Sequence, residues 1–93
     1  MHRSIIQDLN RKICYLCEQE GVVEVHHCLH GTANRKKAEE DGLMVNLCIR
    51  CHRRLHDKGY GDEKLKALAQ LAWEAYYMRS AKEFIERYGR NYI

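Results

Sequence analysis

Four of the five cysteines are arranged as two Cys-x-x-Cys pairs, in which Cys14 precedes Cys17 and Cys48 precedes Cys51. A pair with this spacing on a tight turn can direct two thiolates at one ion, and two such turns complete a tetrahedral zinc site. A redox motif needs only one pair, set in a strand–helix–strand context that is not evident here. The spacing therefore predicts a closed structural zinc site, with Cys28 left over as a small buried side chain.

Several histidines have the spacing of a catalytic metal site. His52 and His56 lie four residues apart, so on a helix they share one face and can hold one ion together. His26 and His27 are adjacent at the end of an expected strand, where side chains alternate between faces. One of these two can therefore be a ligand and the other a general base. Asn46 can hydrogen-bond an imidazole and fix its tautomer.

Positive charge is concentrated in the middle of the chain. The net charge is +3, and residues 35–58 hold seven basic against four acidic side chains. A charged cluster of this kind is commonly a solvated surface, but it is also what contacts with DNA phosphates require. The candidates for these contacts are Arg35, Lys36, Lys37, Arg53 and Arg54.

The pattern of apolar residues predicts the strands that must position these side chains. Residues 22–26 alternate and contain β-branched side chains, and residues 43–47 form a short apolar run. Both segments predict strands. The connection over residues 29–42 is expected to be a long loop, of which residues 34–41 can form a helical turn.

Helices are expected in the second half of the chain. Residues 51–56 predict the first turns of one helix, and Asp62 is expected to act as the N-cap of a long helix that reaches residue 78. Its apolar stripe is expected to comprise Leu65, Leu68, Ala69, Ala72 and Tyr76. The sequence of residues 80–83 matches a capping box and opens a last short helix, which Gly89 closes.

The length and composition fit one folded α+β domain over residues 1–93, with a core at residues 14–57 and packing helices at residues 62–93. Hydrophobic residues make up 45% and charged residues 31% of the chain, as in ordinary globular proteins. The longest run without a charged residue or a histidine, residues 42–49, is too short to span a membrane. The N-terminal region contains no apolar segment typical of export signals, so we expect reduced thiols and a cytoplasmic location.

With these histidine and cysteine motifs the chain resembles a known family, the HNH (ββα-metal) endonucleases. The matching pieces are Val25-His26-His27, then the segment from Asn46 to His52, and His56 one helical turn later. The resemblance covers about residues 14–57 and implies a zinc-stapled, treble-clef-like ββα-metal unit with two C-terminal packing helices. The remainder of the chain is similar to small HNH proteins of phages and prophages of Gram-positive bacteria.

The resemblance also implies roles for the single residues. His26 and His52 stand at positions that ligate the metal in the family, and His27 stands at the position of the general base. Asn46 matches the amide that orients this base, although in some relatives the middle residue of the motif binds metal instead. His56 matches only those relatives that have a second helical histidine. The resemblance gives it two alternative roles: a metal ligand, or a contact to the scissile phosphate. Neither His2 nor His30 receives a role.

The activity implied by the resemblance is hydrolysis of DNA phosphodiester bonds with one divalent ion. Mg²⁺ or Mn²⁺ is expected, and Ni²⁺ or Zn²⁺ can also occupy imidazole sites. Because no sequence-reading module is visible, we expect low sequence specificity. The narrower similarity suggests phage or host proteins of recombination or packaging as partners, in the cytoplasm of a bacterial or phage-infected cell.

Two other functions fit parts of the same sequence. A non-catalytic, zinc-stabilised nucleic-acid-binding module needs the cysteines but not His27 or Asn46. A zinc-dependent protein-interaction module needs neither these two residues nor the basic cluster. The full set of histidines and asparagine favours the nuclease over both.

Overall fold

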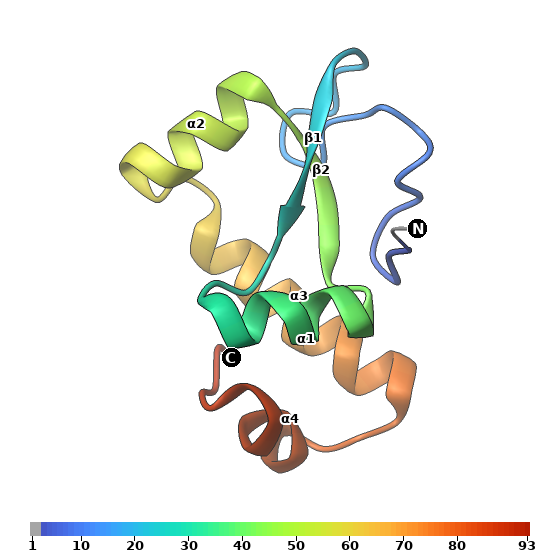
Figure 1. Cartoon of the computed structure of the whole chain (residues 1–93), viewed down its shortest axis with the longest axis vertical. Helices are drawn as coiled ribbons and strands as arrows, with labels where there is room; N and C mark the ends of the chain where they lie inside the picture. Colours follow the sequence, from blue (N-terminus) through green and yellow to red (C-terminus); the bar gives the residue numbers. More distant parts are fainter. Residues whose placement is uncertain (1–2) are drawn as a thin grey trace.

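The computed structural model describes residues 3–93, so His2 lies outside the described residues. Within this range the chain forms two strands and four helices, and the predicted α+β class is confirmed (Figure 1). The elements follow in the order β1 (Val23–His27), α1 (Thr32–Asp41), β2 (Met44–Cys48), α2 (Ile49–Lys58), α3 (Asp62–Tyr77) and α4 (Ala81–Tyr88).

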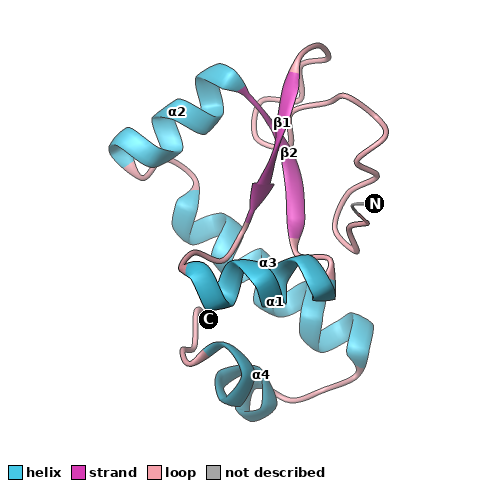
Figure 2. Ribbon diagram, in the orientation of Figure 1, coloured by secondary structure: helices cyan, strands magenta, loops and turns pink. Residues whose placement is uncertain are grey.

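The two strands pair antiparallel, with Val25 opposite Asn46 and His26 opposite Val45. Each strand begins one residue later than the sequence pattern predicts. Val22 remains outside β1 and is 78% exposed, because the pairing with β2 ends at Val23. Helix α2 flanks one side of the strand pair, and the N-terminal segment runs along the other side (Figure 2).

The connection between the strands contains a complete ten-residue helix, α1, where a loop with one helical turn is expected. The sequence of α1 has no apolar stripe to reveal it, since only Ala38 is buried. Its alanine, lysine, arginine and glutamate residues nevertheless favour helix. Gly42 ends α1 in the left-handed conformation, with φ of 79°. A Cβ atom there would lie 3.0 Å from the Arg3 carbonyl oxygen, so glycine is required.

The apolar core joins the helices to the strand pair. Its fully buried side chains include Ala38, Leu47, Leu65 and Phe84, and Cys28 packs among them as predicted. Because these residues come from different segments of the chain, burying them brings α3 and α4 against the strand-bearing half. No helix in residues 3–93 is long and apolar enough to cross a membrane.

Helix α3 departs from its prediction at both ends. Gly61 occupies the N-cap position without a side-chain bond, so the prediction of Asp62 as N-cap is wrong. The Asp62 carboxylate is instead engaged by His30 and Lys66. The buried face contains Leu65, Ala69, Gln70 and Trp73, whereas Tyr76 is 58% exposed. The buried stripe is therefore rotated away from Tyr76 relative to the predicted stripe.

The capping box of α4 and its glycine end are both confirmed. The Ser80 hydroxyl accepts a hydrogen bond from the Glu83 N–H, and the Glu83 carboxylate accepts one from the Ser80 N–H. Gly89 ends the helix in the left-handed conformation. These local bonds set the limits of α4, so its position was readable from the sequence.

Candidate metal centres

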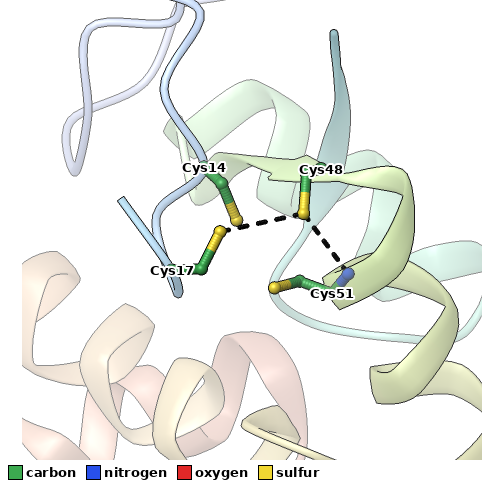
Figure 3. Close-up of side chains that lie close together, drawn as sticks. All are labelled: Cys14, Cys17, Cys48 and Cys51. Carbon is green, nitrogen blue, oxygen red and sulfur yellow. Dashed lines mark hydrogen bonds between the residues drawn. The ribbon is translucent and has the colours of Figure 1, made fainter. Parts of the chain in front are cut away.

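The four paired cysteines form one cluster, although they come from distant parts of the chain (Figure 3). Their sulfur atoms all lie within 4.8 Å of one another, and Sγ of Cys17 lies 3.8 Å from Sγ of Cys48. A tetrahedral zinc site with Zn–S distances of about 2.3 Å has sulfur–sulfur edges of about 3.8 Å. The geometry is therefore close to that of a zinc site, and all five cysteines are free thiols.

Tight backbone turns hold these thiols in place. In the first turn, the Glu18 N–H donates to the Cys14 carbonyl at 2.8 Å, and Glu18 is left-handed with φ of 64°. In the second, Cys48 is the N-cap of α2, and its sulfur accepts a hydrogen bond from the Cys51 N–H at 3.4 Å. The end of β2 and the start of α2 thus lie against the N-terminal turn, with the sulfur atoms of the two pairs close together.

The ionisation of the cluster is uneven. Burial alone would raise the pKa of Cys14, but backbone N–H groups, including that of Cys17, lower it to about 6. Burial and hydrogen bonds with the other thiols raise the pKa of Cys51 to about 12. Ionising all four thiols together therefore requires a compensating cation, which is the chemistry of a four-cysteine metal site.

A second cluster consists of three histidines from β1 and α2. Nε2 of His52 lies 3.1 Å from Nε2 of His56 and 3.3 Å from Nδ1 of His26. Imidazole ligands bound at about 2.0–2.1 Å around a tetrahedral ion are separated by about 3.3 Å. The three nitrogens therefore fit one divalent ion. They line a pocket of about 490 Å³ together with His27, His30 and Arg35.

The positions of the three histidines on β1 and α2 explain why their rings converge. His52 and His56 are one turn apart on α2 and share a face, and α2 packs against the strand pair. His26 lies on β1 and is 3% exposed. Burial lowers the pKa of His26 to about 3, and the neighbouring histidines act in the same direction. The ring is therefore neutral near pH 7 and retains the lone pair that a ligand needs.

A carboxylate holds the middle histidine of this group. Oε1 of Glu24 lies 2.9 Å from Nδ1 of His52, which leaves Nε2 directed at the other two rings. Metal-binding histidines commonly have a carboxylate or carbonyl on their second nitrogen. Glu24 is two residues before His26, so the two share a face of β1. This period of two was the signal that could have identified Glu24 from the sequence.

His27 lies on the opposite face of β1 from His26, as strand alternation requires. Its Nε2 atom is 3.5 Å from Oε2 of Glu39 on α1, and the residue lines the histidine pocket. Asn46 is diagonal to His27 in the strand pairing. The Asn46 amide nitrogen donates to the carbonyls of Leu9 and Arg11. The amide thus anchors the N-terminal segment to β2, and its action on His27 stays a prediction.

The basic residues of α1 have different environments. Arg35 lines the histidine pocket, and Lys36 is exposed. The Lys37 ammonium donates to the Arg87 carbonyl at 2.7 Å and so joins α1 to α4. Arg35 is therefore the residue of this group that is placed to meet a ligand in the pocket.

The basic residues of α2 follow directly after His52. Arg53 and Arg54 are both exposed. The Arg54 guanidinium carbon lies 4.3 Å from the centre of the Tyr60 ring, a cation–π contact that restricts the side chain. Both charges are thus carried by the helix that supplies two of the three histidines.

A further group of potential ligands overlaps the three histidines. His30 and Asp62, neither of which was predicted to bind metal, place donor atoms within 4.8 Å of each other and of His26. Their contact spans thirty-two residues of sequence, and no local pattern indicates it.

No family model, curated protein or solved structure matches the chain. The chemistry of these groups therefore carries the functional argument.

Proposed function

We propose that the chain is a metal-dependent endonuclease of the HNH (ββα-metal) type that hydrolyses phosphodiester bonds of DNA. The observation that carries the proposal is the approach of three imidazole nitrogens, from His26, His52 and His56, in one open pocket. In this proposal β1, β2 and α2 are the ββα-metal unit. The four-cysteine cluster holds a structural zinc ion, and α3 and α4 are the packing helices.

The three histidines would hold the catalytic ion. When bound there, a divalent ion stabilises the charge that develops on the scissile phosphate and on the leaving 3′ oxygen. Mg²⁺, Mn²⁺, Ni²⁺ and Zn²⁺ are the candidates, with imidazole favouring the later members of this series. Glu24 keeps His52 in the tautomer that leaves Nε2 free for the ion.

His27 is the proposed general base. It takes a proton from the water that attacks the phosphorus in line with the leaving oxygen, which yields a 5′ phosphate and a 3′ hydroxyl. Glu39 lies against its Nε2 atom and disfavours rotation of the ring away from this position. Asn46 is proposed to support the same ring through the strand pair.

The basic residues are proposed to contact the DNA backbone. Arg35 is proposed to contact the phosphate, because it lines the histidine pocket, and Arg53, Arg54 and Lys36 would extend the positive surface on α2 and α1. Such contacts position a nucleic acid but do not read its sequence, so low sequence specificity is part of the proposal. A role in phage recombination or packaging in a bacterial cytoplasm rests on the resemblance alone.

Plasmid nicking tests this proposal. Supercoiled DNA is incubated with the protein and each of the four ions, and the nicked product is treated with DNA ligase. We expect ion-dependent nicks that ligase reseals, because a 5′ phosphate and a 3′ hydroxyl are its substrates. His27→Ala is expected to lower nicking by at least ~100-fold without altering the circular dichroism spectrum or the zinc content.

Lys82→Ala is the matched control, because Lys82 is exposed on α4 and does not line the histidine pocket. It should nick at the wild-type rate. Equal nicking by wild type and His27→Ala would reject the catalytic assignment. Binding of DNA at low salt without any nicking would instead support a nucleic-acid-binding module, and no binding at all would support a protein-interaction module.

A further inference from the structure

A second set of ligand atoms lies beside the three-histidine centre. His26, His30 and Asp62 each place a donor atom within 4.8 Å of the other two. Nε2 of His30 lies 2.6 Å from Oδ1 of Asp62, and the rings of His26 and His30 are 5.5 Å apart. The three residues come from β1, the following loop and the start of α3. The three-histidine group does not use His30 or Asp62.

His26 belongs to both sets. Nδ1 lies 3.3 Å from Nε2 of His52, within the three-histidine group. Nε2 is buried and has no hydrogen-bond partner among the described residues. A buried polar atom without a partner is costly and uncommon in folded proteins. An ion bound at His26 would account for a buried imidazole nitrogen without a partner.

The two oxygens of Asp62 are divided between two neighbours. Oδ2 lies 2.9 Å from the Lys66 ammonium, one turn along α3, and Oδ1 faces His30. Burial raises the pKa of Asp62, but the bonds from Lys66 and His30 outweigh it and hold the pKa below its ordinary value. Lys66 therefore holds one oxygen of the carboxylate and leaves Oδ1 directed at His30.

We infer that His26, His30 and Asp62 form a second divalent-cation position, alternative to the three-histidine centre. Its donor set of two nitrogens and one carboxylate oxygen suits Mn²⁺ or Mg²⁺, whereas three imidazoles suit Zn²⁺ or Ni²⁺. A neutral imidazole has one lone pair, so an ion at either position takes the lone pair of His26. Ions at the two positions therefore exclude one another.

The inference rests on the proposed function in that it takes the three-histidine group as a cation centre. It adds that the two positions prefer different ions, because their donor atoms differ in chemical hardness. An excess of zinc would thus empty the Mn²⁺ position through His26 without contacting His30 or Asp62.

Binding of Mn²⁺ tests the inference without DNA. Protein that contains one zinc ion per chain is titrated with Mn²⁺, and free Mn²⁺ is followed by its electron paramagnetic resonance signal. We expect one Mn²⁺ per chain in the wild type. Asp62→Asn and His30→Gln should each weaken Mn²⁺ binding by at least ~10-fold, because loss of even a residue behind a ligand costs about that much. Both should leave the affinity for a second zinc ion, measured against a chromophoric chelator, unchanged.

His52→Gln should have the opposite effect, with a loss of the second zinc ion and retention of Mn²⁺. Glu63→Gln is the matched control, because Glu63 is the next acidic residue of α3 and also lies near Lys66, at 3.8 Å. It should change neither affinity. In the wild type, added zinc should displace the bound Mn²⁺ stoichiometrically. Circular dichroism establishes that each variant is folded, and His30→Gln provides the test if Asp62→Asn unfolds.

Three results would overturn the inference: no Mn²⁺ bound to the wild type, equal loss of Mn²⁺ in His52→Gln and Asp62→Asn, or simultaneous binding of Mn²⁺ and the second zinc ion. These results are separable from failure of the nuclease proposal. A protein that never nicks DNA but shows the two opposite losses retains the second position. A protein that nicks DNA with unchanged Mn²⁺ affinity in Asp62→Asn and His30→Gln does not have it.

Discussion

Glu24 Oε1 lies 2.9 Å from His52 Nδ1, and this contact joins β1 to α2 beside the candidate metal centre. The side chain of Glu24 is 53% exposed and that of His52 is 21% exposed. As a surface ion pair it would contribute little to stability. The contact instead selects the tautomer of His52, because a proton held on Nδ1 leaves the lone pair on Nε2.

The first prediction follows from this contact. Glu24→Ala should weaken metal binding at the three-histidine centre by ~10–100-fold, as for other carboxylates behind histidine ligands. The temperature of unfolding should change little. Calorimetric titration with zinc, after the cysteine cluster is loaded, measures the affinity. Glu20→Ala, an exposed acidic residue before β1, is the control, and an equal loss in both variants would contradict the tautomer argument.

The proposed structural zinc site leads to a prediction about folding. Cys48→Ser removes one sulfur of the cluster but keeps a side-chain acceptor for the Cys51 N–H, so the change tests the metal site alone. Because a structural zinc contributes on the order of 10 kcal/mol to folding, this variant should be unfolded by circular dichroism. Cys28→Ala removes a thiol outside the cluster and should keep its zinc. A soluble, native-like Cys48→Ser protein would refute a structural zinc.

The carboxylate of Asp41 is expected to stabilise the contact between α1 and the C-terminal helices. It accepts hydrogen bonds from Trp73 Nε1 at 2.9 Å and Arg87 Nε at 2.6 Å, and also from the Tyr88 hydroxyl. Asp41→Ala leaves these donors without an acceptor, so urea unfolding should show a loss of about 3 kcal/mol.

Glu40→Ala provides the comparison for Asp41. Glu40 contacts the same arginine at 3.2 Å, but its side chain is 55% exposed. The expected loss is therefore below about 0.5 kcal/mol. Similar losses at the two positions would show that the charge of the arginine, rather than the shared, partly buried acceptor, determines the stability of this contact.

Glu18 offers a prediction of the opposite sign. Its φ of 64° places a side-chain-bearing residue in the left-handed region, which costs about 1 kcal/mol relative to glycine. Glu18→Gly should therefore raise the free energy of unfolding by about 0.5–1 kcal/mol. Glu20→Gly, in the isolated bridge with Ile13, should lower it. Destabilisation by both glycines would exclude relief of strain at Glu18.

The cap of α4 should depend on pH. The Ser80 N–H donates to Glu83 and holds the pKa of its carboxyl below the ordinary value. A lowered pKa means that the carboxylate stabilises the fold above the pKa of the unfolded chain, and that this contribution disappears as the pH falls through the folded pKa. The difference in stability between wild type and Glu83→Gln should therefore shrink between pH 7 and pH 3.

Glu86→Gln is the control for this titration, because Glu86 is exposed on the same helix and has no part in the capping box. Urea unfolding at each pH measures both differences. A constant difference for Glu83→Gln over this range would contradict a role of its ionised form in the cap.

The sequence alone determined the features that depend on local spacing. The two Cys-x-x-Cys turns, the four-residue step from His52 to His56 and the capping box at Ser80 each involve residues within one turn of the chain. Their geometry follows from the turn itself. The alternation of His26 and His27 follows likewise from the pleat of a strand.

Only the tertiary structure decided which of these local features meet. Helix α1 lacked an apolar stripe, so its length was not visible in the sequence. The contact of His30 with Asp62 depends on how the start of α3 lies against the connection after β1, which no local pattern specifies. In the same region Asp62 does not cap α3. Its carboxylate contacts His30 and Lys66 instead. Long-range contacts of this kind arise from the burial of the shared core, which is not encoded at any single position.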